Sequence, residues 1–424
     1  MKKKTRLRLS AAVCGILLLL GACAGQNSVV NYEDSPKSAT ITFFGNKYEP
    51  ENVTVIEEII SDFMTENPEI RVSYESLKGS DYYKALENRM AAGKGDDVFM
   101  VNHDAVLAFE AKGQLADLSG LSSVTEYTDA MRGQMEDGQK ITWLPTTVSA
   151  FGLYCNLDLL EKHGQTVPKT LPEWERVCDY FVSQGITPII ANNDISLKTL
   201  AIGVGFYHVY QDGRQEEVFG NLNRGEEPLS QYLRPGFALV EEMLQKGYVD
   251  ADVALETQKT SDDLQSFVQG GAPFMLTGAW AAGRVDGMHP DFSFEVNPIP
   301  ALEDGAFLVI NPDTRLSVNA NSPHLEQAIK FVEFFTREDN IQKFADQQAS
   351  FSPLKGGKPS GEEEIQPLLA TYQAGKTVIG ADGMLELPIW DWTAQVSQKL
   401  LSGESLTASM DWLDQQTIGK GETP

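Results

Sequence analysis

Residues 39–77, ATITFFGNKYEPENVTVIEEIISDFMTENPEIRVSYESL, decide the fold class. The stretch begins as an alternating apolar strand that ends at Gly45 and Asn46. A helical pattern follows, whose apolar face carries Val55, Ile56, Ile59, Ile60, Phe63 and Met64. Pro68 stops this helix, and residues 70–77 return as a second strand. The stretch therefore predicts a strand–helix–strand unit.

The alternation continues along the chain. Residues 81–95 are again helical and close on two glycines, and residues 96–102 form a third strand. Strands that alternate with helices at this spacing indicate a parallel sheet with crossover helices.

A second set of elements follows after a break. Residues 141–156 form a long extended stretch with a proline, 171–185 look helical, and 186–192 read as a buried strand. Helical patterns cover 230–270 with interruptions near Gly247 and at 251–260, then 324–347 and 388–417, while 315–323 form a strand. A mature chain of about 400 residues is longer than a single hydrophobic core usually accommodates, so we expect two lobes.

The N-terminus has the pattern of a bacterial secretion signal. Five positive charges and no acid lead into an uncharged run at 9–22, which is too short to span a bilayer as a helix. Residues 20–23, Leu-Gly-Ala-Cys, resemble a lipobox, so we expect a signal peptide at 1–22 and acylation, including palmitate, of Cys23. Ordinary cleavage that leaves Cys23 free is the alternative. Residues 23–38 are polar and predict a flexible, lipid-anchored tether.

The chain is strongly acidic, with a formal charge of −26, and about −31 once residues 1–22 are removed. Such a surface repels nucleic acid and anionic lipid, so acyl chains rather than a basic patch would hold it at the cell membrane. The five histidines are scattered, and no HExxH, GxSxG or P-loop pattern occurs, so we expect no metal, no cofactor and no enzyme activity. Cys155 and Cys178 could form a disulfide, but two buried thiols are favoured because a fold of this size does not need a disulfide for stability.

Several short sequence motifs, in a fixed order along the chain, indicate a resemblance to a known family. They are ITFFGN (41–46), FMTENPEIRVSYE (63–75), MAAGKGDDVFMV (90–101), GLYCNLDLLEKHG (152–164) with VPKTLPEWE (167–175), FVQGGAPFMLTGAW (267–280) and LSVNANSPHLEQAIKFVEFF (316–335). In this order the chain resembles the sugar-binding family 1 of extracellular solute-binding proteins of bacterial ABC importers, which includes maltose-binding protein. It departs from the family pattern at Asp96 in place of Pro, Cys155 in place of Tyr and Leu171 in place of Trp. We expect Asp96 and Cys155 to lie near the cleft.

The resemblance implies an α/β fold of the type II periplasmic-binding-protein kind. Its two lobes are each a mostly parallel sheet flanked by helices, and both are discontinuous in sequence. We expect lobe 1 to hold 39–146 and 300–349, and lobe 2 to hold 147–299 and 350–424. Open parallel sheets bind ligands beyond the carboxyl ends of their strands, and clefts between domains are preferred ligand sites.

The candidate site residues directly follow predicted strands or match the family's ligand positions. The substrate-binding set comprises Asn46, Lys47, Tyr48, Asn102, His103, Asp104, Asn192, Asp194, Trp280 and Trp390, with Asn193 beside it. Polar groups match sugar hydroxyls as donors or acceptors, and flat rings match the C–H faces of a sugar. The resemblance implies sugar contacts at Lys47 and Asp104 and stacking at Trp280 and Trp390.

Structural roles stay open for several of these residues. A Trp just past a strand is often a core or interface filler, a lone His such as His103 is often structural, and Asp104 could be a solvated or capping residue. We assign Trp143 and Trp412 to packing and Trp174 to the core.

The expected function is that of an extracytoplasmic, monomeric substrate-binding protein of an ABC sugar importer, anchored by lipid on Cys23. It would capture a mono- or oligosaccharide between its lobes and deliver it to the permease without chemistry. A non-sugar solute (a polyamine, a peptide or a glycerol-phosphate compound) is the alternative, and a carbohydrate hydrolase with paired carboxylates is a third.

Overall fold

The computed structural model describes residues 39–138, 140–358 and 360–418. The chain divides into two units, Met1–Lys37 and Ser38–Pro424. The first unit lies outside the described residues, and so do the predicted signal peptide, Cys23 and the tether.

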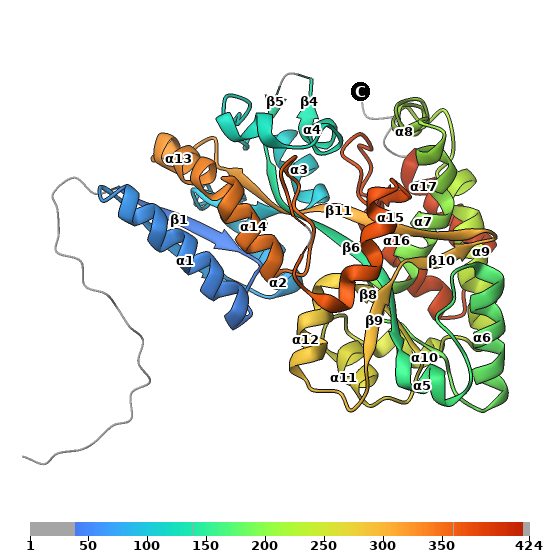
Figure 1. Ribbon diagram of the computed structural model, residues 1–424. Helices are drawn as coiled ribbons and strands as arrows, with labels where there is room; N and C mark the ends of the chain where they lie inside the picture. Colours follow the sequence, from blue (N-terminus) through green and yellow to red (C-terminus); the bar gives the residue numbers. More distant parts are fainter. Residues whose placement is uncertain (1–38, 139, 359, 419–424) are drawn as a thin grey trace, which may run out of the picture. The chain divides into compact units, whose positions relative to one another are not determined.

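The strand–helix–strand unit predicted at 39–77 is confirmed. Strand β1 (Ala39–Gly45) pairs in parallel with β2 (Ile70–Ser76) over its whole length, and β3 (Val98–Val101) pairs in parallel with its other edge. Helix α1 (Pro50–Glu66) connects β1 to β2, and α2 (Gly79–Ala91) connects β2 to β3 (Figure 1). Pro50 stands in the first turn of α1, where the missing N–H of proline would have no helical partner.

A single ten-stranded sheet runs through the protein in the order β2-β1-β3-β11-β6-β8-β7. Its long members are β6 (Leu144–Asn156) and β11 (Gly305–Val318), which pair antiparallel with each other. The other strands are β7 (Ile189–Ile190), β8 (Phe274–Gly278), β9 (Phe294–Asn297), β10 (Ile299–Leu302) and β12 (Thr377–Ile379), with β4 (Glu136–Asp137) and β5 (Lys140–Ile141) forming a separate pair.

The two crossing strands change the expected sheet arrangement. We expected a mostly parallel sheet in each lobe, whereas β11 pairs antiparallel with β3 at one end and in parallel with β12 at the other. Strand β6 likewise continues from β11 to antiparallel β8 and β9. At about 3.3 Å per residue these strands are long enough to belong to both halves of the sheet, which is why the sheet is mixed and continuous.

Helices cover the sheet. Besides α1 and α2 they are α3 (His103–Glu110), α4 (Asp129–Met135), α5 (Leu157–Lys162), α6 (Leu171–Ser183), α7 (Ile195–Gln211), α8 (Gln215–Asn223), α9 (Ser230–Gln245), α10 (Ala251–Glu256), α11 (Asp262–Val268), α12 (Ala282–Gly287), α13 (Leu325–Phe335), α14 (Glu338–Gln347), α15 (Gln366–Gln373), α16 (Ile389–Leu401) and α17 (Leu406–Ile418), with short 3-10 turns η1 (Ser122–Glu126), η2 (Ala279–Ala281) and η3 (Glu363–Ile365).

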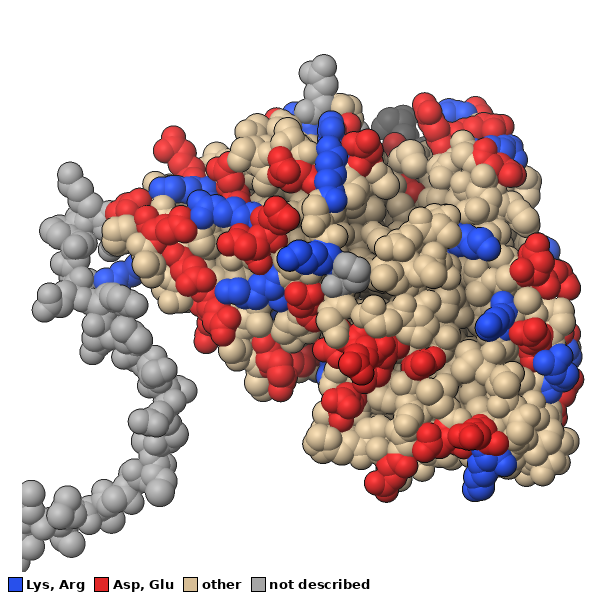
Figure 2. Space-filling view, in the orientation of Figure 1, with Lys and Arg blue, Asp and Glu red and all other residues tan. Residues whose placement is uncertain are grey.

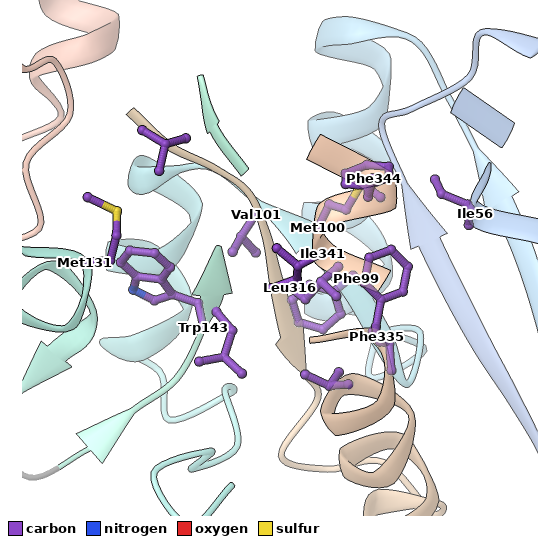
Figure 3. Close-up of a cluster of buried hydrophobic side chains, with 14 of the residues drawn as sticks. Ile56, Phe99, Met100, Val101, Met131, Trp143, Leu316, Phe335, Ile341 and Phe344 are labelled. Atoms are coloured by element: carbon purple, nitrogen blue, oxygen red, sulfur yellow. The ribbon is translucent and has the colours of Figure 1, made fainter. Parts of the chain in front are cut away.

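Two clusters of buried apolar side chains form the core. The first includes β1, β3, α1 and α13, and Figure 3 shows part of it with Trp143 and Phe335. The second gathers around α6, α7 and α9 and contains Trp174, whose side chain is fully buried. The packing roles expected for Trp143 and Trp174 are confirmed.

Helix α7 is the main element that the sequence pattern did not reveal. It is buried on nearly all sides by α9, α16 and neighbouring strands, so it lacks the polar face that gives a helix its periodic signature. The helix predicted over 324–347 is in turn two helices, α13 and α14, separated at Thr336 and Arg337.

Other expectations concern the thiols and the surface. Cys155 and Cys178 are both free and buried, as expected.

Acidic side chains are spread widely over the face shown in Figure 2, with basic ones among them. Within residues 39–138, 140–358 and 360–418, no helix combines the length and hydropathy needed to cross a bilayer.

Candidate functional site

A cavity of about 740 Å³ brings together most of the predicted site residues. Nine of them line it, namely Asn46, Lys47, Tyr48, Asn102, His103, Asp104, Asp194, Trp280 and Trp390, together with Asn193. They come from the segments after β1, β3, β7 and β8 and from the start of α16. Strand ends and, for Trp390, the family resemblance therefore selected residues that the fold gathers around one cavity, which we call the main cavity.

Asn192 is the exception, because it does not line the main cavity. Its side chain is buried, and its amide nitrogen donates to the carboxylate of Asp263 at 2.9 Å. Its carbonyl oxygen accepts from the backbone N–H groups of Asp194 and Ile195. Asn192 thus provides hydrogen-bond partners for a buried acid and for the start of α7.

Asp96 and Cys155 also lie elsewhere than expected. Neither residue lines the main cavity. Asp96 forms an ion pair with Arg89 at 2.9 Å, and Cys155 is fully buried within β6, where burial raises the pKa of its thiol. Of these two departures from the family pattern, Asp96 therefore serves an ion pair and Cys155 serves packing inside β6.

Three aromatic rings form one wall of the main cavity. Phe151 on β6 lies between the two indoles, with ring centroids 5.0 Å from Trp280 and 5.4 Å from Trp390. Trp280 meets Phe151 edge-on, at an interplanar angle of 85°. Trp280 and Trp390 are both only partly buried, so each keeps exposed ring surface. Phe151 was not predicted, because it lies inside a strand.

Gly278 fixes where the indole of Trp280 lies. A β carbon at this position would stand 2.1, 2.2 and 2.3 Å from Cη2, Cζ3 and Cζ2 of the ring. Such similar distances to three consecutive ring atoms mean that Gly278 faces the ring rather than its edge. Only a residue without a side chain lets the indole lie this close to the backbone.

A buried lysine supports the second indole. The Nζ atom of Lys198 lies 4.1 Å from the ring centroid of Trp390 and donates to its backbone carbonyl at 3.1 Å. The same ammonium group pairs with Asp194 at 2.6 Å, and Lys259 pairs with the other carboxylate oxygen. A cation over an indole face is attracted by the ring quadrupole. Trp390 therefore has one face occupied by the protein itself.

The charges of this group shift each other's pKa values. Burial lowers the pKa of Lys198 to about 8, although Asp194 acts in the opposite direction. Burial alone would raise the pKa of Asp194, but the ammonium groups of Lys198 and Lys259 outweigh it and hold that pKa well below its usual range. The ion pair is thus present at neutral pH.

The segment after β1 forms the opposite wall. Lys47 donates to the side-chain oxygen of Gln348 at 2.5 Å, and Asn46 donates to the hydroxyl of Tyr83 at 3.2 Å. The hydroxyl of Tyr74 donates to the backbone carbonyl of Lys47 at 2.7 Å, which holds this turn in place. Burial lowers the pKa of Lys47, while the carboxylates around it act to raise it.

The residues after β3 combine a structural role with a place in the cavity wall. Asn102 caps α3, since its side-chain oxygen accepts from the backbone N–H of Ala105 at 2.8 Å. The ring of His103 is buried, and its Nε2 lies 2.8 Å from the carbonyl oxygen of Leu385. His103 therefore ties this wall to the segment before α16.

Strands β6 and β11 supply cavity residues that the sequence did not suggest. Ser149, Asn311, Asp313 and Arg315 line the main cavity from positions inside these strands. Arg315 is almost fully buried, and burial lowers its pKa to about 10 against the effect of Asp313 and other nearby groups. Strand-end reasoning misses such residues because it looks only beyond the last residue of a strand.

The charged lining is balanced although the whole chain carries −26. Six basic side chains face six acidic ones: Lys47, Lys78, Lys198, Lys259, Arg284 and Arg315 against Glu49, Asp81, Asp104, Asp194, Asp313 and Asp391. One pair joins opposite walls, since Arg284 of α12 lies 3.3 Å from Glu49, which precedes α1. The described residues contain no cluster of three or more His, Cys, Asp or Glu side chains that could hold a metal ion.

The mixed sheet with two crossing strands, and the main cavity beside them, are those of a two-lobed solute-binding protein. The solute-binding protein RafE in complex with raffinose superposes with a TM-score of 0.73 and 22% identity, covering 91% of this chain and all of that one. A chitin oligosaccharide binding protein gives a TM-score of 0.75 at 17% identity, with coverage of 91% and 100%. The two-lobed α/β fold class predicted from the sequence is confirmed, although its sheet is mixed rather than mostly parallel.

Residues 46–342 match the family model for bacterial extracellular solute-binding proteins, and the chain belongs to this family. The multiple sugar-binding protein of Streptococcus mutans is 24% identical over 365 residues, covering 83% of each chain. The family is one of binding proteins.

Proposed function

We propose that this protein is the extracellular substrate-binding component of an ABC sugar importer, with the main cavity as its carbohydrate site. The observation that carries the proposal is the aromatic wall, in which Trp280 and Trp390 flank Phe151 and keep exposed ring surface opposite hydrogen-bonding side chains. Sugars need both kinds of contact, because their C–H faces pack on flat rings and their hydroxyls need polar partners. Similar proteins bound to raffinose and to stachyose support this choice.

The balance of charge favours a neutral solute over the alternatives. A polyamine would require an excess of carboxylates in the lining, and a phosphate would require an excess of basic groups. The main cavity has six of each. An uncharged ligand that both donates and accepts hydrogen bonds fits this lining best.

The proposed mechanism is capture by closure of two lobes. We assign residues 39–146 and 300–349 to lobe 1, and 147–299 and 350–424 to lobe 2, with the main cavity between them. Sugar would stabilise the closed arrangement by contacting both lobes, and the Glu49–Arg284 pair would add a contact across the opening. The closed monomer would then dock on the permease, while a lipid on Cys23 holds the protein at the membrane. No covalent chemistry is assigned to this chain.

A thermal-shift screen tests the proposal. The panel contains glucose, maltotriose, raffinose, stachyose and chitin oligosaccharides, with spermidine and glycerol 3-phosphate as the charged alternatives. A ligand that binds only the folded state at 100 times its Kd adds about 2.7 kcal/mol of stability, so a sugar should raise the melting temperature by several degrees. A shift with spermidine or glycerol 3-phosphate alone would assign the cavity to another solute. In a separate test, the protein is incubated with the oligosaccharides and the mixture is analysed by chromatography; the formation of shorter saccharides would indicate a hydrolase.

A further inference from the structure

The middle of the two crossing strands presents one continuous polar surface to the main cavity. In the antiparallel register Ser149 of β6 lies opposite Asn311 of β11. Alternate residues of a strand share one face, so Asn311, Asp313 and Arg315 lie on the same side as Ser149. All four line the main cavity. We call these four residues the crossing-strand patch.

Two polar atoms of this patch have no hydrogen-bond partner among the described residues. They are Oγ of Ser149 and Nη1 of Arg315, and both side chains are more than nine-tenths buried. Buried polar atoms in native proteins nearly always have a partner, because an unpaired one costs its full desolvation. Both atoms belong to residues of the cavity wall. We therefore infer that a bound ligand supplies the missing hydrogen-bond partners.

The unpaired atom of Arg315 is held in a fixed position. Its Nε donates to the carbonyl oxygen of Pro312 at 2.9 Å, and Nη2 donates to that of Ala381 at 3.2 Å. Its Cζ atom lies over the ring of Trp143, 4.1 Å from the ring centroid. These contacts orient the group and use every donor nitrogen except Nη1.

The backbone between the two charged residues of the patch is strained. Thr314 has a φ of 45°, a left-handed conformation that is unfavourable for a β-branched residue. Such strain clusters at ligand sites, where the surrounding structure enforces a required geometry. Here it falls between Asp313 and Arg315.

We propose that the crossing-strand patch is a subsite for the hydroxyl groups of a neutral sugar. Arg315 Nη1 donates, Asp313 accepts, and Ser149 does either, so adjacent hydroxyls of one sugar ring can bind to donor and acceptor side by side. An acidic sugar fits less well, because the charge of Arg315 is already opposed by Asp313 and other nearby acids. This subsite rests on the proposed function and adds to it the residues that form hydrogen bonds with the sugar hydroxyls.

A pair of serine variants tests the subsite. Ser149→Ala removes a hydroxyl that has no partner in the protein, whereas Ser317→Ala removes one that donates to Thr142 at 2.9 Å. Both serines are buried in the crossing strands, but Ser317 does not line the main cavity. The probe is whichever of raffinose, stachyose, maltotriose and the chitin oligosaccharides binds the unmodified protein most tightly by calorimetry.

The two variants should behave in opposite ways. Ser149→Ala should leave the melting temperature of the sugar-free protein unchanged or slightly raised and weaken sugar binding about three- to tenfold. Ser317→Ala should lower the melting temperature by a few degrees and leave sugar binding unchanged. Asp313→Asn, which keeps the size of the side chain, should weaken binding at least tenfold, since hydrogen bonds to charged groups are the stronger ones.

Three results would overturn the subsite. Normal sugar binding by both Ser149→Ala and Asp313→Asn would remove the patch from the site while leaving the proposed function in place. Tighter binding of galacturonic acid oligosaccharides than of the neutral sugars would replace hydroxyl recognition by carboxylate recognition. Failure of every saccharide to bind the unmodified protein would reject the proposed function and the subsite together.

Discussion

Replacing Gly278 by alanine should impair sugar binding without removing any atom of the site. Gly278 has φ −75° and ψ 142°, which alanine adopts without strain, so the backbone tolerates the change. The new methyl group, however, would stand 2.1 Å from Cη2 of Trp280, and ordinary van der Waals contact begins near 3.4 Å. The indole must therefore move by more than about 1 Å.

The size of the effect follows from this displacement. Phe151 packs against the edge of Trp280 and blocks part of the space into which the ring could move. Forcing an extra methyl group into a packed region costs about 1–3 kcal/mol, which lowers the melting temperature. If the displaced ring loses about 60 Å² of apolar contact with the sugar, at about 25 cal/mol per Å² the loss is about 1.5 kcal/mol, or tenfold in Kd.

Calorimetric titration with the best saccharide of the panel measures this loss. Gly271→Ala is the matched control, because Gly271 stands three residues before β8, is exposed and has open space where its β carbon would be. We expect normal binding from the control and at least tenfold weaker binding from Gly278→Ala. Wild-type affinity in a folded Gly278→Ala protein would refute the reasoning that the glycine positions the indole.

The remaining predictions concern single side chains. Trp280→Ala should weaken sugar binding at least tenfold in calorimetry while the far-ultraviolet circular dichroism stays unchanged; equal affinity would remove this ring from the site. Asn192→Ala should lower the free energy of unfolding by about 1–3 kcal/mol in urea titrations, because buried Asp263 loses a donor, yet change sugar affinity less than threefold. For Lys198, whose pKa is lowered by burial from 10.5 to about 8, the unfolded chain binds the proton more tightly. The stability of the wild type relative to Lys198→Met should therefore rise, not fall, from pH 8 to 10.5, by up to about 3 kcal/mol, and a flat difference between the two proteins would contradict the assigned pKa.

Strand-end reasoning worked for the segments after β1, β3 and β8 for a physical reason. Parallel strands all end at the same edge of a sheet, so the residues that follow them converge even when they are far apart in sequence. Lys47 and Asp104 follow the parallel strands β1 and β3 and reached the main cavity in this way. Trp280 follows β8, which runs in the opposite direction to β3 across β11 and β6, so it reaches the cavity from the other half of the sheet. Asn192 does not line the cavity because only four residues separate β7 from α7, and its side-chain oxygen accepts from the backbone N–H groups of Asp194 and Ile195 at the start of that helix.

Residues inside the crossing strands escaped the same reasoning. Phe151 and Arg315 occupy apolar or mixed strand sequences, in which a period of two shows only that neighbours face opposite ways. It does not show which face lies against a helix and which faces the cavity. Lys198 was missed for a similar reason, because α7 is buried on nearly all sides and shows no clear face.

The sequence by itself determined the α/β class, the order of most strands and helices, and the family, because alternating apolar periods and short motifs are local properties of the chain. It also determined which residues stand just beyond strand ends. Only the tertiary structure decided that one mixed sheet joins both halves and that Ser149 meets Asn311 across it. Pairing register, the burial of Arg315 and the close approach of Gly278 to Trp280 depend on contacts between distant segments, which no local pattern contains.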